Sequence, residues 1–72
     1  MSVNEVSVLL CGGPLEGVPE HERLVRVSDP RETFKLFKGN RYEHFLPSSE
    51  SRVVSGREVP VFLWSHRTFV AE

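Results

Sequence analysis

Alternating apolar and polar positions recur along most of the chain and predict β-strands. The stretch 6–11 places Val6, Val8 and Leu10 on one side of an extended backbone, and β-branched residues at a period of two are typical of a strand. A Gly-Gly-Pro sequence follows and ends it, because proline cannot donate to a strand ladder. A second short strand is expected at 24–27, after a polar loop of about ten residues.

Residues 29–39 fit two different structures. An Asp-Pro pair at the start and Gly39 at the end would cap a short helix over 30–38. The alternative is a strand at 33–38, joined to a strand at 41–46 by a tight Gly-Asn turn. Aromatic residues flank that turn on both sides. We therefore expect the strand, with the Asp-Pro pair forming a turn or a single helical turn.

The rest of the chain predicts a hairpin and a central strand. A loop is expected at 47–51, where proline and serine lack apolar periodicity. The segments 52–54 and 58–64 flank a Ser-Gly-Arg sequence, which predicts a hairpin. The second segment is apolar on both faces, so it is expected in the middle of a sheet or in a closing barrel. After a bend or bulge at 65–66 the strand is expected to resume over 67–70.

Together these elements predict a single small, mainly β domain over residues 1–72. Its expected form is an antiparallel meander of five or six strands in a curled sheet or half-barrel, with at most one short helix. A chain of 72 residues buries only about 60% of the surface that its unfolded form exposes, so self-association could add to the core. All seven aromatic residues lie between Phe34 and Phe69, and we expect them first of all in the core.

Charge and cysteine content narrow the class of protein. Nine basic and ten acidic side chains give a net charge of −1, which argues against a general binder of polyanions. The single cysteine, Cys11, excludes an intramolecular disulfide, and this favours a reducing compartment. The apolar run near the N-terminus is too short for a signal peptide or a membrane span. We therefore expect a cytoplasmic protein without membrane association.

The first candidate site is the sequence Arg41-Tyr42-Glu43-His44. On a strand, Tyr42 and His44 share one face while Arg41 and Glu43 share the other. A tyrosine beside a histidine can act as an acid/base pair, because histidine titrates near neutral pH and a phenol can donate a proton. The alternative is a packed tyrosine ring, a hydrogen-bonded histidine at the rim, and an Arg–Glu pair that is solvated or bonded across strands.

The second candidate site is Trp64 with His66 and Arg67. Trp64 and His66 would share a face on a regular strand, and an aromatic ring beside a cation can hold a planar or anionic ligand. The alternative is a core tryptophan with a polar rim. The histidines of the chain lie in separate segments without i, i+2 or i, i+4 spacing, so no metal site is expected. Neither a cofactor nor a catalytic residue is predicted.

Two short stretches, Gly39-Asn40-Arg41-Tyr42-Glu43-His44-Phe45 and Arg67-Thr68-Phe69-Val70-Ala71-Glu72, carry a resemblance that would cover nearly the whole chain. They resemble a family of short, uncharacterised actinobacterial proteins that carry a domain of unknown function and are often encoded near genes for secondary-metabolite biosynthesis. The resemblance implies a bacterial cytoplasmic protein with an accessory role in a biosynthetic pathway. It implies no catalytic residues.

Three functions follow as hypotheses. The first is a binding or interaction module rather than an enzyme, with a protein partner or a second copy of the chain. The second is a small-molecule-binding protein or cyclase-like catalyst that uses Tyr42 and His44, with Arg67 at a barrel mouth. The third is single-stranded nucleic-acid binding, which the overall charge disfavours. It would use alternating aromatic and basic side chains: Phe34, Lys35, Phe37, Lys38, Arg41 and Tyr42.

Overall fold

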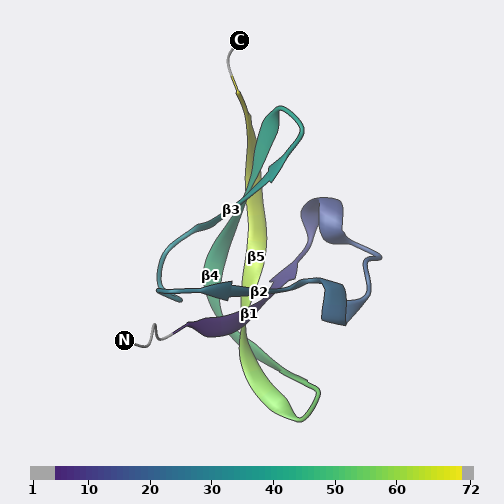
Figure 1. The fold of residues 1–72 in the computed structure, drawn as a ribbon, viewed down its shortest axis with the longest axis vertical. Coiled ribbons are helices and arrows are strands. Elements are labelled where there is room, and N and C mark those ends of the chain that lie inside the picture. The colour runs from purple at the N-terminus through teal and green to yellow at the C-terminus, as the bar shows by residue number, and fades with distance from the viewer. Residues whose placement is uncertain (1–4, 71–72) are drawn as a thin grey trace.

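The computed structural model describes residues 5–70, and these form one mixed sheet of five strands in the order β2-β1-β5-β4-β3 (Figure 1). Two single turns of 3-10 helix, Gly13–Leu15 and Glu20–Glu22, lie between the first two strands. The sheet is open, not closed into a barrel. The strands are β1 (Val6–Cys11), β2 (Leu24–Val27), β3 (Phe34–Lys38), β4 (Arg41–Val54) and β5 (Arg57–Phe69).

The prediction of a mainly β fold is confirmed, but the purely antiparallel meander is wrong at one pairing. β1 runs parallel to β5, with Leu9 opposite Val61 and Leu10 opposite Phe62, whereas the other three pairings are antiparallel. β5 can take β1 as a second neighbour because it is apolar on both faces. A strand of that kind is stable only with neighbours on both edges and cover on both sides. β4 supplies one neighbour and β1 supplies the other.

Residues 34–38 form β3, so the strand was the right alternative for this segment and the helix was wrong. The Asp-Pro pair before it forms a turn, closed by a hydrogen bond from the Glu32 N–H to the Asp29 carbonyl at 3.2 Å. Gly39 has a φ of +65°, which a two-residue hairpin turn with glycine in the first central position requires. The turn after β4 is also two residues long, and both Ser55 and Gly56 have positive φ.

The predicted loop at 47–51 is wrong, because β4 continues through this segment. The register against β5 shifts between Pro47 and Ser51, so the turn-forming residues occupy a bulge inside a long strand. The Ser48 hydroxyl donates to the Val61 carbonyl at 2.6 Å. A side chain thus satisfies an acceptor that the interrupted ladder leaves open.

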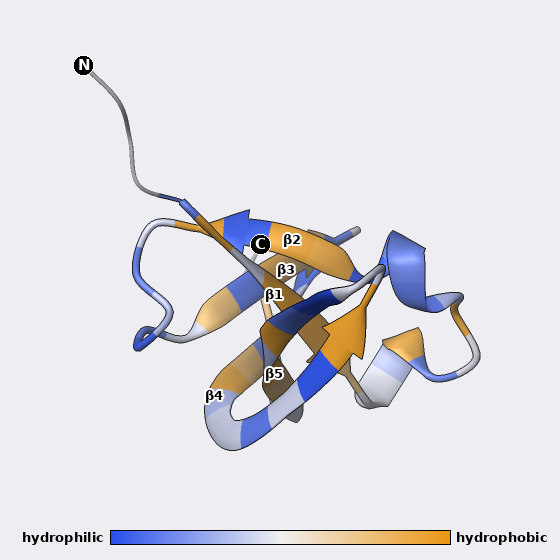
Figure 2. Ribbon diagram, turned by 90° about the horizontal axis from the view of Figure 1, so that it is seen from below, coloured by the Kyte–Doolittle hydropathy of each residue, from blue (hydrophilic) through white to orange (hydrophobic). Residues whose placement is uncertain are grey.

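Apolar side chains gather on both sides of the twisted sheet where the strands cross, and Figure 2 shows hydrophobic segments of β1, β2 and β5 meeting there. Phe45 and Phe62 lie in the larger cluster, which the loop between β1 and β2 covers with Leu15. The smaller cluster on the other side is Leu9, Val54, Val59 and Val61. The central place of β5 is confirmed.

The expectation that the aromatic residues form the core holds for only part of the set. Phe45 and Phe62 are fully buried, whereas Phe37, Tyr42 and Phe69 are exposed. The exposed rings lie at the end of the sheet made by β3 and the adjoining parts of β4 and β5, beyond the cover of β1 and β2. No other strand packs over this end in the described part of the chain.

The loop between β1 and β2 closes onto Trp64. Gly13 has a φ of +60°, and a Cβ atom at this position would lie only 2.4 Å from the Cγ atom of Trp64. Arg23 fixes the other end of the loop, with its Nε–H donating to the Val18 carbonyl at 2.9 Å and Nη1 donating to the Leu10 carbonyl at 2.8 Å. The loop is therefore a packed cover that holds the indole in place.

Candidate functional site

The end of the sheet made by β3, β4 and β5 is a three-stranded platform with two different faces. Its registers align side chains in rows, because residues directly opposite one another in a sheet point to the same side. We call one side the glutamate face. Its rows are Lys38–Arg41–Phe69, Leu36–Glu43–Arg67 and Phe34–Phe45–Trp64.

Glu43 lies at the centre of the glutamate face and has no exposed surface. Its Oε2 atom accepts hydrogen bonds from the Nε–H groups of Arg41 at 2.7 Å and Arg67 at 2.8 Å. Its Oε1 atom accepts one from the indole N–H of Trp64 at 2.9 Å. Both carboxylate oxygens thus have charged or strongly polar donors, which a buried carboxylate requires.

These donors also determine the ionisation of the carboxyl group. Burial by itself raises the pKa of Glu43, but the hydrogen bonds from Arg41, Trp64 and Arg67 outweigh it and lower the pKa from 4.5 to about 2. Glu43 is therefore a carboxylate at every physiological pH. It cannot act as a general acid or base near neutrality, and its position suits it to orient the two guanidinium groups.

The opposite side of the platform is the histidine face. Its surface is more exposed than that of the glutamate face, and it carries aromatic, imidazole and aliphatic side chains. The rows are Phe37–Tyr42–Thr68, Lys35–His44–His66 and the pair Leu46–Leu63.

Two histidines stack at the centre of this face. The imidazole rings of His44 and His66 are parallel within 8°, with centroids 4.2 Å apart. His44 Nε2 is hydrogen-bonded to Thr68 Oγ1 at 2.8 Å. Partial burial, the neighbouring His66 and the charge of Lys35 all lower the pKa of His44. The neutral form of His44 is therefore favoured at physiological pH.

The structure divides the six candidate residues between the two faces. Tyr42, His44 and His66 lie on the histidine face, as the alternation in 41–44 predicted for the first two. Arg41, Trp64 and Arg67 lie on the glutamate face. They do not form one site.

The expectation that Trp64 and His66 share a face is wrong because the strand is not regular at Ser65. His44 pairs with His66 and Phe45 pairs with Trp64, so Ser65 is an extra residue in β5. This bulge reverses the alternation and turns Trp64 toward Glu43. The predicted bend or bulge at 65–66 is therefore present, and it places Trp64 and His66 of the second candidate site on opposite faces of the sheet.

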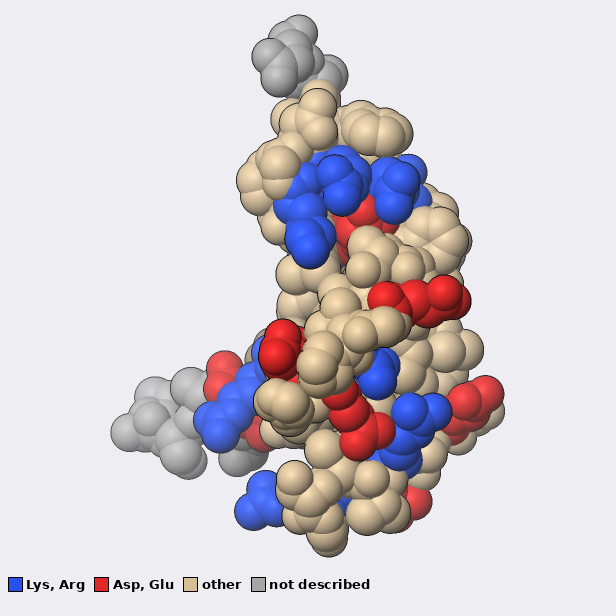
Figure 3. Space-filling view, turned by 90° about the vertical axis from the view of Figure 1, so that its right-hand side faces the viewer, with Lys and Arg blue, Asp and Glu red and all other residues tan. Residues whose placement is uncertain are grey.

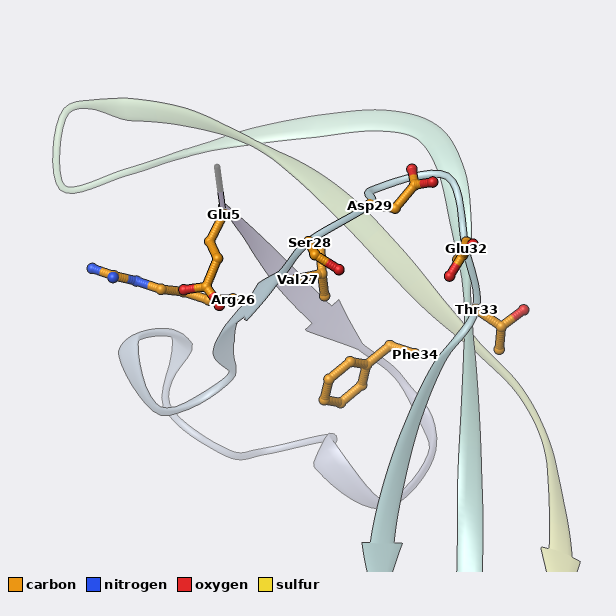
Figure 4. Close-up of a pocket in the computed structure, with 8 residues that line it drawn as sticks. All are labelled: Glu5, Arg26, Val27, Ser28, Asp29, Glu32, Thr33 and Phe34. Atoms are coloured by element: carbon orange, nitrogen blue, oxygen red, sulfur yellow. The ribbon is translucent and has the colours of Figure 1, made fainter. Parts of the chain in front are cut away.

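Two shallow pockets lie away from the six residues of the two candidate sites. One, of about 330 Å³, lies between the end of β2 and the start of β3, with Asp29, Glu32 and Phe34 among its lining residues (Figure 4). The other, of about 390 Å³, is lined by parts of β1, β2 and β5. Among residues 5–70 no group of three or more histidine, cysteine, aspartate or glutamate side chains is arranged to hold a metal ion.

Sequence reasoning missed Glu43 as the organising residue of the platform. A glutamate between a tyrosine and a histidine is most simply interpreted as solvated. One available signal was the alternation itself, because Glu43 shares its strand face with the apolar Phe45. The other was Arg41 two residues earlier on that face. The partners Trp64 and Arg67 became visible only with the register of β4 against β5.

Comparisons with known proteins bear on the resemblance carried by the two motifs 39–45 and 67–72, and they support its domain of unknown function alone. The last two residues of the second motif, 71–72, lie outside the described structure. No helix in residues 5–70 is long and apolar enough to cross a membrane. Neither a curated protein nor a solved structure matches the chain. A family model does match, over residues 2–72, and the chain therefore belongs to the family of unknown function DUF5988.

Proposed function

We propose that the protein is a non-catalytic interaction module that binds a partner protein through the histidine face. The observation that carries this proposal is the exposure of large apolar side chains on that face. Phe37 is 55% exposed and Leu63 is 41% exposed, and Tyr42 and Leu46 between them are also exposed. Clustered exposed apolar residues on a soluble surface are typical of protein–protein contact sites.

The shape of the face supports a protein rather than a small molecule as the partner. Its side chains stand on three hydrogen-bonded strands, and neither described pocket includes any of them. Small ligands are usually held in concave sites, whereas interfaces between proteins are flat and rich in aromatic residues. Strand β3 also lies at the edge of the sheet, where a partner strand can pair with its backbone.

The arrangement gives less support to the catalytic alternative. Tyr42 and His44 share a face, but the hydrogen bond of His44 is to the hydroxyl of Thr68. The nearest carboxylate in sequence, Glu43, points to the other face and is occupied by three donors. A histidine general base is usually oriented by a carboxylate or carbonyl on its second nitrogen. An acid/base pair would lack that support.

Nucleic-acid binding is also less well supported. The six alternating aromatic and basic residues divide between the faces, with Phe34, Lys38 and Arg41 on one side and Lys35, Phe37 and Tyr42 on the other. A stacking platform for single strands needs the rings and the cations on one surface. The family resemblance suggests instead an accessory role beside biosynthetic enzymes, and these are the first partners to examine.

The experiment compares two substitutions on the histidine face with a matched substitution elsewhere. Phe37→Lys and Leu63→Lys place a charge on the face, and Val53→Lys makes the same kind of change at a residue that is 65% exposed in the far hairpin. Light scattering measures self-association of the 8.2 kDa chain. Affinity capture with a tagged chain, followed by binding measurements with the purified candidate, measures association with another protein.

We expect both histidine-face variants to lose the complex and Val53→Lys to keep it. A complex that survives both face substitutions contradicts the proposal, whether it is a homodimer or contains another protein. So does a monomer that binds none of the biosynthetic enzymes tested. Far-UV circular dichroism confirms that each variant keeps its strands, so that loss of binding is not loss of folding.

A further inference from the structure

The glutamate face carries more positive charge than its carboxylate can balance. Lys38 and Arg41 are directly opposite each other on neighbouring strands, and Arg67 is opposite Glu43. Three cations thus surround one anion, which leaves a local charge of +2. Figure 3 shows basic side chains gathered around an acidic one near the C-terminal end of the molecule.

This excess is concentrated at one end of a chain that is acidic elsewhere. Segments 34–46 and 63–70 contain four basic residues and one acidic residue, a charge of +3, whereas the whole chain carries −1. Lys38 and Arg41 are like charges directly opposite one another in the sheet, and such pairs are destabilising. Their gathering therefore opposes the stability of the sheet, and an anion bound between them would relieve that cost.

The two guanidinium groups are held in a way that leaves most of their donors available. Arg41 and Arg67 each use the Nε–H group to bind Glu43. A guanidinium has five N–H donors, and the Nη atoms of these two make no hydrogen bond within residues 5–70. The side chains are 33% and 40% exposed, so the free groups are accessible to solvent.

The carboxylate of Glu43 orients these groups in advance. It is buried, it stays ionised, and the indole of Trp64 fixes its second oxygen. An arginine held at its Nε atom by a rigid acceptor loses less side-chain entropy when its outer nitrogens bind a ligand. Paired arginine forks with a nearby lysine match the geometry of carboxylate and phosphate groups.

We propose that Lys38, Arg41 and Arg67 form a binding site for an oxyanion, a carboxylate or phosphate group, with Glu43 as the positioning residue. Phe69, which is 68% exposed and directly opposite Arg41, provides an apolar flank for the group that carries the anion. The site lies on the side of the sheet away from the histidine face. It therefore stands or fails independently of the proposed interaction there.

The test is a titration of the ¹⁵N-labelled chain with inorganic phosphate, with sodium chloride of equal ionic strength as the reference. The backbone amides of β3–β5 and the Nε–H signals of Arg41 and Arg67 are followed by NMR. A site predicts saturable shifts in these signals that chloride does not reproduce. A second titration uses a short peptide rich in glutamate, which distinguishes a free anion from the acidic side chains of a macromolecule.

Three variants localise the effect. Lys38→Gln removes one cation outside the Glu43 network and is expected to weaken binding about fivefold. Arg67→Lys keeps the charge but loses the fork, and about tenfold weaker binding is expected. Lys35→Gln makes the same charge change as Lys38→Gln on the opposite face, and it should leave the affinity unchanged.

Saturable shifts with phosphate support the site and identify a free anion as its ligand. Saturable shifts with the peptide but not with phosphate also support the site, and they identify the acidic side chains of a macromolecule as the source of the oxyanion. Shifts that follow ionic strength for both salts overturn the proposal, because they report general screening. Equal weakening by Lys35→Gln and Lys38→Gln also overturns it. If Arg67→Lys disturbs the spectrum of the free chain, the comparison of the two lysine variants still decides the outcome.

Discussion

The contact between Gly13 and Trp64 makes a sharp prediction about stability. Replacing Gly13 with alanine adds a Cβ atom that would lie 2.4 to 2.7 Å from three indole carbons, at a φ of +60°. The left-handed φ costs an L-residue about 1–2 kcal/mol, and overpacking of this kind costs about 1–3 kcal/mol. We expect Gly13→Ala to lower the free energy of unfolding by about 2–5 kcal/mol.

A loss of that size is large for this chain but measurable. A protein of 72 residues has a total stability of about 4–11 kcal/mol. Urea unfolding, followed by circular dichroism and by the fluorescence of the single tryptophan, gives the difference. If the indole moves rather than the loop, its hydrogen bond to Glu43 is lost and its emission shifts to longer wavelength.

Two controls separate the steric part of the loss from the backbone part. Gly17 lies in the same loop with a φ of +85° and has nothing within 4 Å of an added Cβ atom, so Gly17→Ala reports the backbone part alone. In a Trp64→Leu background the steric part of the Gly13→Ala loss should largely disappear. The reasoning is refuted if Gly13→Ala costs no more than Gly17→Ala, or if its cost is the same with leucine at position 64.

Three further predictions concern charge. Because the pKa of Glu43 is lowered from 4.5 to about 2, the contribution of its carboxylate to stability is complete above pH 4.5 and is lost as the pH falls toward 2. Urea unfolding at pH 7 and pH 3 should show this loss of stability. In Glu43→Gln the difference in stability between the two pH values should be smaller. The pKa of His44 is lowered by burial, by His66 and by Lys35, so stability should fall as the pH drops below 6.5, and His66→Ala should raise the pKa of His44 in an NMR titration. Arg23→Met removes charged hydrogen bonds to two main-chain carbonyls, and it should destabilise the fold by about 2–4 kcal/mol. Amide hydrogen exchange in the loop before Arg23 should become faster. Unchanged exchange there would show that Arg23 does not fix the loop.

Local pattern was enough to predict most of the strands. The Gly39 and Ser55-Gly56 turns place the two hairpins correctly, because a short turn determines which strands are neighbours. The apolar run in β5 correctly predicted a central strand. The pairing of β1 with β5 was not predictable in this way, since period-two alternation shows which residues share a face but not which strand lies beside them.

The candidate site was predicted less completely than the fold, and the bulge at Ser65 is the reason. Alternation correctly separated Tyr42 and His44 from Arg41, because β4 is regular there. An extra residue in β5 reverses the faces beyond it, so Trp64 and Arg67 join the side of the sheet that Glu43 occupies. The sequence has no local signal for that insertion beyond a break in apolar character.

The parallel pairing of β1 with β5 also affects the order in which the chain can fold. β1 and β2 are adjacent in the sheet, as are β3 and β4, but only β5 joins these two pairs. Among the strands of residues 5–70 β5 comes last in the chain, so during synthesis Val8 and Leu10 lack Phe62, which shares their buried cluster, until the ribosome has made it. Contacts between such distant segments slow folding. A nascent chain of this protein is therefore expected to remain two separate, unstable hairpins and to become protease-resistant in one late step.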